Sequence, residues 1–313
     1  MKRIVLIGAG FLGSALAVGA ARRGWSATAI SHSDPFALRD TDAGPGEIQL
    51  LPGSGVERLP DSLDREADAI VIAAGGRFPL PSAAAPVADA IGTLSLVIGL
   101  CEQIRTLSPR TKIVLLSSAG AVYAPGDEPK CESDLGEPTT PYGMSRRMGE
   151  EYMDYYHRMH GLSTLSLRCA NVYGRLLPRS RGQGVISAAF WSALTRKPFT
   201  MHGTGRQTRD FIHVDDFVAA TLDLLESTRD LPPTLNVGTG TGSSIVDVLE
   251  AVGKAMGTHI AAVAGPHAQT DTGNLTVDLS MLRKIIDFEP MDLTTGIGRM
   301  AGEMAADGPV WSQ

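Results

Sequence analysis

The chain has 313 residues, of which 43% are hydrophobic and 20% charged, and its formal net charge is −6. This length fits a nucleotide-binding domain with a smaller second lobe, and this composition is typical of a globular protein with a large core. The negative charge argues against nucleic acid or an anionic membrane as a partner. The three cysteines, Cys101, Cys131 and Cys169, are odd in number and far apart. They exclude a disulfide framework and a paired-cysteine metal site.

The first residues combine an apolar run with two preceding basic side chains, as a signal peptide would. Glycines interrupt this run, and Arg22 and Arg23 follow it, so we interpret it as part of the fold. We count no uninterrupted apolar stretch long enough to span a bilayer. We therefore expect a cytoplasmic protein without a membrane partner.

Short β-branched runs alternate with Ala- and Leu-rich segments of helical period in the first half of the chain. The runs are RIVLIG, SATAIS, DAIVIAAG and KIVLLSS. This alternation predicts an α/β fold of the Rossmann type, a doubly wound parallel sheet with helices on both faces. We expect a further helix over 142–160, before a strand LSTLSLRCANVYG, and a short helix over 185–194.

The composition changes beyond Gly174, where loops rich in Gly, Arg and Pro follow. We expect a dinucleotide-binding Rossmann domain over 1–174. The segment 208–240 is expected to return to it, because the strand TLNVGTG can rejoin the main sheet. The remainder of 175–313 is then mainly a substrate-binding lobe.

The motif GAGFLG places Gly8, Gly10 and Gly13 directly after a strand and at the start of a helix. The first glycine permits a tight turn, the second lets a pyrophosphate approach the backbone, and the third lets helix pack on strand. Backbone N–H groups at the helix start, including those of Phe11 and Leu12, then face the phosphate charge. The motif predicts a dinucleotide cofactor.

The end of the second strand reads Ser31, His32, Ser33, where an acid commonly binds the adenosine ribose. No carboxylate stands there to repel a 2′-phosphate, and His32, Ser33 and Arg39 could donate hydrogen bonds to one. The pattern slightly favours NADP, and the following Asp34 keeps NAD open. A polar turn without any binding role would explain the same residues.

The stretch PYGMSRRMGE places Arg146 four residues after Tyr142. A phenol alone is a poor base at neutral pH, because its ordinary pKa is about 10. Residues i and i+4 share a helix face, so the arginine would favour the phenolate form. A helix start with a solvated arginine is the alternative.

These motifs, with SSAGAVY, LRCANVYG and GTGRQTRDFIHVDD, resemble those of the extended short-chain dehydrogenase/reductases. More narrowly, the chain resembles the NAD-dependent epimerase/dehydratase family that acts on nucleotide sugars. The resemblance covers nearly the whole chain. It implies a homodimer whose interface is formed by the helix around 94–104 and the segment 151–160.

The resemblance also assigns roles to single residues. It makes Tyr142 the catalytic acid/base, and it places Arg146 where the family has a lysine that holds the nicotinamide ribose. Ala74 falls at the strand end near the nicotinamide. The substrate-side positions are Asn171, Val185 and Arg209, with the arginine at the diphosphate.

The family's substrate-contacting hydroxyl lies four residues before the tyrosine of its VYG signature. Here that tyrosine is Tyr123, and the position holds Ala119. Ser118 and Ser117 precede it and point to opposite sides of a strand. We expect Ser118 to supply the hydroxyl, with serines that only cap the strand end as the alternative.

Gly120 and Ala121 stand where the family's dehydratases carry an Asp-Glu pair, so dehydration is not expected. We predict C4 epimerisation or ketoreduction of a nucleotide sugar, with NADP or NAD as cofactor and no metal. The family's second phosphate-binding arginine has no counterpart near PHAQTDTGN, which leaves open a reductase of a non-sugar carbonyl. Arg146 and Ala119 together leave open a catalytically silent dinucleotide-binding protein.

Overall fold

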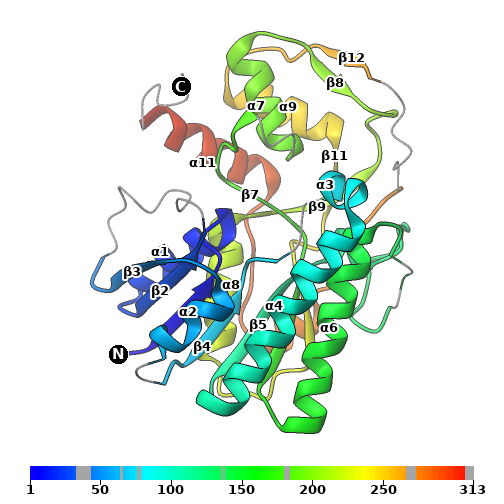
Figure 1. The fold of residues 1–313 in the computed structure, drawn as a ribbon. Helices are drawn as coiled ribbons and strands as arrows, with labels where there is room; N and C mark the ends of the chain where they lie inside the picture. The colour runs from blue at the N-terminus through cyan, green and yellow to red at the C-terminus, as the bar shows by residue number, and fades with distance from the viewer. Residues whose placement is uncertain are drawn as a thin grey trace.

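Seven parallel strands form the central sheet of the computed structural model (Figure 1), in the order β10-β6-β5-β4-β1-β2-β3. The structure describes residues 1–32, 44–63, 66–75, 79–134, 136, 138–179, 184–265 and 273–306. The strands are β1 (Arg3–Ile7), β2 (Ser26–Ser31), β3 (Glu47–Pro52), β4 (Ala69–Ile72), β5 (Lys112–Ser118), β6 (Thr164–Cys169) and β10 (Thr234–Val237). The strand order reverses between β1 and β4, and ligands of such sheets bind outside the carboxyl ends of the strands at this point.

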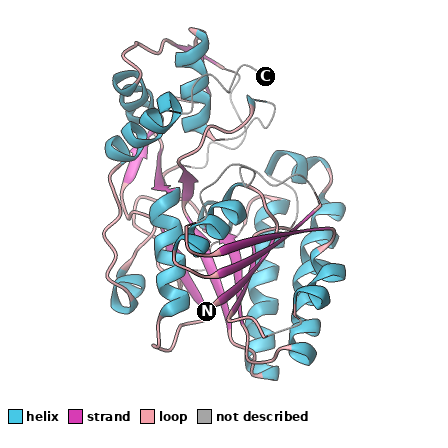
Figure 2. Ribbon diagram, turned by 90° about the vertical axis from the view of Figure 1, so that its left-hand side faces the viewer, coloured by secondary structure: helices cyan, strands magenta, loops and turns pink. Residues whose placement is uncertain are grey.

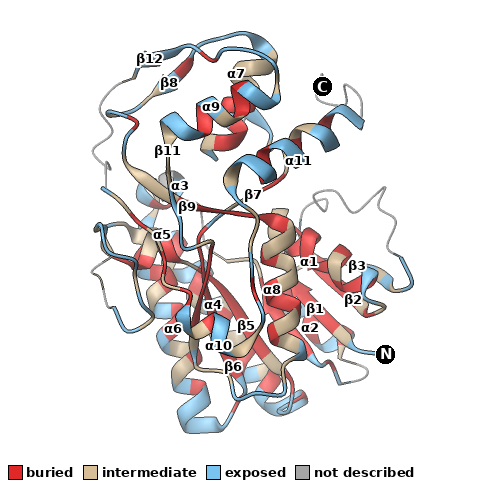
Figure 3. Ribbon diagram, turned by 180° about the vertical axis from the view of Figure 1, so that it is seen from behind, coloured by how far each residue is buried: buried red, intermediate tan, exposed pale blue. Residues whose placement is uncertain are grey.

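Helices cover both faces of this sheet. On β1, Ile4 and Leu6 belong to one buried cluster and Val5 and Ile7 to the other, because successive side chains of a strand alternate between faces. The first face carries α1 (Phe11–Arg22), α8 (Val214–Glu226) and α10 (Ser280–Ile285), and the second carries α2 (Gly55–Ser62), α4 (Pro86–Leu107) and α6 (Pro141–His160). Figure 3 shows the buried strands between these layers. The predicted Rossmann-type fold is confirmed.

The smaller lobe stands above the carboxyl ends of the strands (Figure 2). Its buried cluster joins three helices to strands of two small sheets, ordered β11-β9-β7 and β12-β8. The helices are α7 (Val185–Thr195), α9 (Ile245–Ala255) and α11 (Leu293–Ala306), and the strands are β7 (Asn171–Tyr173), β8 (Phe199–Met201), β9 (Thr208–His213), β11 (Gly242–Ser244) and β12 (Ala262–Ala264). Two short helices, α3 (Pro79–Ala84) and α5 (Ala119–Val122), follow β4 and β5.

Two sequence expectations need correction. LSTLSLRCANVYG is not one strand, because the chain leaves the main sheet at Ala170, whose N–H donates to the carbonyl of Val237 at 2.8 Å. The next residues form β7 and pair with β9 instead. The edge strand β3 was not predicted, because most of its side chains are exposed and it carries no buried apolar run. The strand TLNVGTG does pair with β6, as β10.

The apolar sequence of the helix α4 is interrupted by Asp89 and Glu102, but its mean hydropathy is high. This helix has 22 residues and is long and apolar enough, by length and composition alone, to cross a bilayer. In this fold it lies beside α6 and contributes Val97, Leu100 and Ile104 to a buried cluster under the sheet. Core helices of globular proteins share this composition.

Candidate active site

The glycine turn after β1 is shaped by close contacts of its own backbone. Gly8 has φ +104°, and a Cβ on Gly13 would lie 1.9 Å from the Gly8 carbonyl oxygen. A Cβ on Gly10, by contrast, would meet nothing within 4 Å among the described residues. Gly10 is the N-cap of α1, with no side-chain cap and no acidic residue in the first turn. The turn therefore has room for a pyrophosphate and no carboxylate in that first turn to repel it.

The turn adjoins the end of β4. A Cβ on Gly8 would lie 2.7 Å from the Ala74 Cβ, and the next carbonyl, that of Gly75, accepts a hydrogen bond from Nη2 of Arg146. The predicted cofactor residues Gly8 and Ala74 thus lie together, and Arg146 adjoins them through Gly75. On the ribose side, His32 is exposed, while Ser33, Asp34 and Arg39 lie outside the described residues.

The start of α6 sets the place of Tyr142. Thr140 is the N-cap, and its side chain accepts a hydrogen bond from the Gly143 N–H at 3.0 Å. A Cβ on Gly143 would lie 2.2 Å from the carbonyl oxygen of Ala121. Only glycine permits this approach. The first turn of α6 therefore packs against α5, the helix that begins directly after Ser118.

Arg146 lies under Tyr142 and is 8% exposed. Its guanidinium carbon is 5.0 Å from the centroid of the Tyr142 ring, so the cation faces the ring. Its Nη1 donates to the Leu116 carbonyl at 3.4 Å, and its Nε is buried without a hydrogen-bond partner among the described residues. An unpaired buried donor beside the glycine turn fits a cofactor hydroxyl as its partner.

The three residues at the end of β5 have different surroundings. Ser117 is buried, and its hydroxyl donates to Oε1 of Glu150. Ala119, in the position where the family has a hydroxyl, is fully buried in the core. Ser118, in contrast to the buried Ser117 and Ala119, is half-buried. Of these three side chains, that of Ser118 is therefore the one available to a ligand.

Tyr123, the tyrosine that follows α5, is buried and hydrogen-bonded. Burial is the main cause that raises the pKa of Tyr123 to about 12, against the opposing effect of Arg168. Its hydroxyl donates to Oδ1 of Asn236 at 2.7 Å. A buried phenol with a raised pKa stays protonated at neutral pH.

The smaller lobe contains a cavity of about 510 Å³ that includes two of the predicted substrate residues, Val185 and Arg209. The Arg209 guanidinium donates to the carbonyl oxygens of Thr208, at 2.8 Å, and Gly273. Asn171 lies on the neighbouring strand β7, and its side chain donates to the Asp210 carbonyl at 3.0 Å. The cavity lining includes neither Tyr142 nor Ser118, so the structure separates the predicted substrate residues into two groups.

The sequence profile of the NAD-dependent epimerase/dehydratase family matches residues 4–238. The chain belongs to this family. A UDP-glucose 4-epimerase of Azospirillum brasilense is 29% identical over 95% of this chain and 90% of its own length. A Methanocaldococcus jannaschii protein, provisionally assigned as a UDP-glucose 4-epimerase, is 31% identical over 62% of this chain. The chain spans 63% of that relative's length and 59% of the length of a Bacillus subtilis relative.

Solved structures of the family share the fold over nearly the whole chain. The Thermotoga maritima UDP-glucose 4-epimerase with UDP-glucose has a TM-score of 0.87 at 23% identity, covering 98% of this chain and 99% of its own. The Thermus thermophilus UDP-glucose 4-epimerase in complex with NAD has a TM-score of 0.83 at 25% identity, covering 96% and 98%. The first of these likenesses shows the fold alone.

Several residues around this family member's candidate site were missed by the sequence analysis. Trp191, Lys197 and Phe199 line the cavity, and Trp191 Nε1 donates to the Leu177 carbonyl at 2.9 Å. A tryptophan and a phenylalanine at helical or strand spacing carry no signal that separates a cavity from a core. Glu150 was also missed, although its spacing of four from Arg146 places both on one face of α6.

Proposed function

We propose that this family member is an NAD(P)-dependent enzyme that epimerises or reduces a nucleotide sugar by hydride transfer at C4. One observation carries the proposal: the Tyr142 phenol lies over the Arg146 guanidinium, and this arginine adjoins the glycine turn through Gly75. The proposed proton-transferring group and the proposed dinucleotide site would then meet at the carboxyl ends of β4 and β5. Ligands of parallel sheets bind at such ends.

The chain's own residues would divide the reaction as follows. Tyr142 accepts the proton of the substrate hydroxyl at C4 as C4 is oxidised to a carbonyl. It returns the proton when the carbonyl is reduced. Ser118 donates a hydrogen bond to the same oxygen. Arg146 holds positive charge beside the phenol and adjoins the proposed cofactor site through Gly75. A bound NAD(P) supplies the hydride acceptor and donor.

The cavity with Val185 and Arg209 is the proposed site of the nucleotide. Its lining combines cations, Arg209 and Lys197, with the aromatic side chains Trp191 and Phe199, which suits a phosphate and a base. Solved structures with the same fold contain UDP-sugars, such as UDP-glucose in the Thermotoga maritima enzyme. Arg179 and Lys197 also line the cavity and offer charge that the family's second phosphate-binding arginine would otherwise provide.

A panel of nucleotide sugars tests this proposal. We expect one or more to be converted to a C4 epimer, or reduced, with a requirement for the nucleotide part. Equal conversion of a phosphate-free carbonyl would favour the non-sugar reductase. A protein that binds cofactor and transfers no hydride to any substrate would be the silent alternative.

The choice between NADP and NAD depends on the end of β2. The absence of a carboxylate from Ser31 to Ser33 supports NADP, whereas several similar structures contain NAD. We propose that NADP binds at least as tightly as NAD. Calorimetry in which NAD is preferred tenfold, about 1.4 kcal/mol, would contradict this and make Asp34 the ribose ligand.

We also propose a cytoplasmic homodimer that joins through α4 and α6, which lie side by side (Figure 1). Both helices carry exposed apolar side chains, among them Val87 at 70%, Ile91 at 62% and Met159 at 61% exposure. Such a surface is typical of an interaction site. Sedimentation should show a dimer, and Ile91→Glu combined with Met148→Glu should yield monomers. A monomeric wild type would contradict the proposal.

A further inference from the structure

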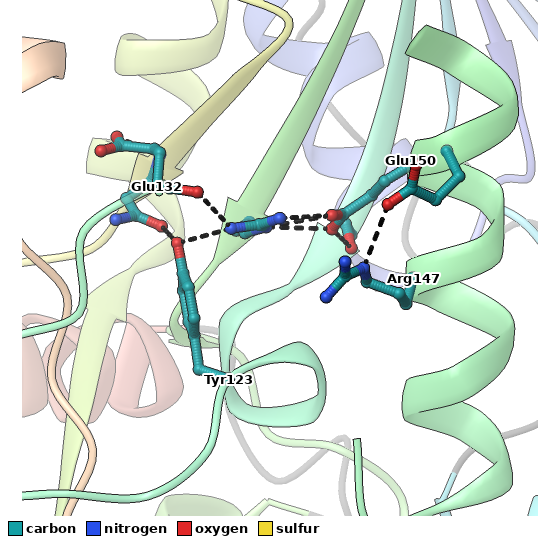
Figure 4. A network of polar contacts seen from close by, with 8 residues as sticks. Tyr123, Glu132, Arg147 and Glu150 are labelled. Atoms are coloured by element: carbon teal, nitrogen blue, oxygen red, sulfur yellow. Dashed lines mark hydrogen bonds and ion pairs between the residues drawn. The ribbon is translucent and has the colours of Figure 1, made fainter. Parts of the chain in front are cut away.

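Figure 4 shows a network of polar contacts in which Arg168 joins Glu150 to Tyr123 and Glu132. At its centre, Nη2 of Arg168 on β6 lies 2.8 Å from Oε2 of Glu150 on α6, and the arginine Nε lies 3.0 Å from the same oxygen. The two side chains are 6% and 5% exposed. Desolvation of two charges offsets much of their attraction, so this pair is weak evidence for stability. A role in fixing one arrangement of the elements accounts for it better.

Arg168 also holds the network on its other side. Its Nη1 donates to the Tyr123 hydroxyl at 2.9 Å and to the Glu132 carbonyl at 3.0 Å. The Tyr123 hydroxyl in turn donates to Asn236 on β10. Arg168 therefore holds the Glu150 carboxylate in place. Another rotamer of Arg168 would leave the buried oxygens of Glu150 and Tyr123 without this donor.

The remaining partner of Glu150 lies next to the candidate active site. The Ser117 hydroxyl donates to Oε1 of Glu150, while Ser118 is the next residue of β5. Neighbouring side chains of a strand point to opposite sides, so Ser117 held against α6 leaves Ser118 directed away from Glu150. Glu150 stands one turn beyond Arg146 on α6, so this hydrogen bond adds a second side-chain tie between β5 and α6, beside that from Arg146 to the Leu116 carbonyl.

We propose that Glu150, held by Arg168, is a positioning residue for the reaction. Its hydrogen bond with Ser117 helps to hold the end of β5 against α6, and with it the backbone of Ser118, the proposed substrate contact, relative to Tyr142. Both groups must reach one substrate oxygen, and a misplacement of about 1 Å costs up to about 10²-fold in rate. The inference rests on the proposed function of Ser118 and Tyr142.

Two serine-to-alanine variants test it as a matched pair. Ser117→Ala removes the hydroxyl and leaves the Glu150–Arg168 pair in place. Ser166→Ala removes an equally buried hydroxyl on β6 that has no hydrogen-bond partner among the described residues. We expect kcat of Ser117→Ala to fall about tenfold, with KM and cofactor affinity unchanged. Ser166→Ala should keep the wild-type kcat, and Ser117→Ala should melt at a lower temperature than Ser166→Ala, because it takes one donor from a buried carboxylate.

Conservative rescue adds a second readout. Ser117→Thr returns the hydroxyl at a strand position, where β-branched residues are favoured, and should restore most of kcat. Equal kcat for Ser117→Ala and Ser166→Ala, with Ser118→Ala inactive, would overturn the positioning role and leave the proposed function standing. Full activity of Ser118→Ala would instead overturn the role proposed for Ser118, and the positioning role with it.

A crystal structure of Ser117→Ala decides the matter without turnover. We expect the end of β5, including Ser118, to shift relative to Tyr142, while β6 and the Glu150–Arg168 pair stay in place. A variant in which Ser118 superposes on its wild-type position would overturn the inference.

Discussion

The glycine turn after β1 and the cavity of the smaller lobe are both proposed to receive phosphate groups, and they are built differently. The turn is made by the backbone of consecutive residues that contact one another, as Gly13 contacts Gly8. The cavity is made by side chains of α7, β8 and β9, which are distant along the chain. Its arginine, Arg209, depends on the carbonyl of Gly273 for its place.

Local steric contacts thus determine the shape of the glycine turn, whereas tertiary contacts determine the shape of the cavity. A backbone site tolerates change in the rest of the chain, because each of its donors is fixed by the turn. A side-chain site can change its ligand by single substitutions, because each donor is one residue. We therefore expect the cofactor side to be robust and the substrate side to carry the specificity.

If both regions serve one reaction, the largest effect should follow the loss of the group that transfers the proton. Tyr142→Phe should lower kcat by about 10²–10⁴-fold, because no other phenol in the described site is placed to replace it. Tyr155→Phe, which removes an exposed phenol of the same helix, is the control and should leave kcat unchanged. Undiminished turnover of Tyr142→Phe would refute the enzymatic proposal as stated.

Arg209→Ala addresses the substrate region alone. Loss of a charged hydrogen bond should weaken the binding of a nucleotide sugar by about 1.5–3 kcal/mol, measured by calorimetry. Cofactor affinity should hardly change, since the cofactor residues lie in the other region. Arg206→Ala, an exposed arginine of the same segment outside the cavity lining, should bind like wild type. An equal loss for a phosphate-free carbonyl would point to the non-sugar reductase.

Two glycine variants sharpen the contrast within the turn. Gly13→Ala forces a Cβ against the Gly8 carbonyl, and we expect the free energy of unfolding to fall by about 1–3 kcal/mol, the range for overpacking. Gly10→Ala adds its Cβ in open space and should change that free energy by less than about 1 kcal/mol. It should nonetheless weaken cofactor binding, because the methyl group occupies the space of the pyrophosphate. Equal stability of the two variants in denaturant unfolding would contradict this account.

The smallest effect is expected for Arg146→Lys. The substitution keeps the charge beside Tyr142 and changes the donor geometry at the Gly75 and Leu116 carbonyls. Activity should stay within about tenfold of wild type, at most ~1.4 kcal/mol in the barrier. A wild type without activity, together with an active Arg146→Lys, would identify the arginine as the mark of a disabled site.

Much of the fold could be predicted because its signals are local. The apolar period and the Thr140–Pro141 start place α6 at Pro141–His160, close to the expected 142–160, and the short helix α7 begins at the expected residue. The glycine turn could be predicted because the steric needs of Gly8 and Gly13 arise within the motif. The break between β6 and β7 could not, because the partner strand β9 comes much later in the chain.

The candidate site was less accessible to sequence reasoning for the same reason. Two serines precede Ala119, and the sequence alone does not show which of them faces a ligand. The structure places Ser117 against Glu150. The position of the Arg146 guanidinium over the ring depends on the carbonyls of Leu116 in β5 and of Gly75 beyond the end of β4, which are distant from Arg146 along the chain. The roles of these residues stay predictions until the variants are measured.

Hydride transfer at C4 is tested most directly with a nucleotide sugar that carries deuterium at that carbon. The holoprotein should convert it with a primary isotope effect, and the deuterium should be found at C4 of the epimer or on the reduced cofactor. Tyr142→Phe should show almost no conversion of the same substrate. Deuterium released into water during epimerisation would contradict hydride transfer. So would wild-type protein that neither converts a labelled nucleotide sugar in the presence of oxidised cofactor nor reduces a 4-keto nucleotide sugar with a deuterium-labelled reduced cofactor.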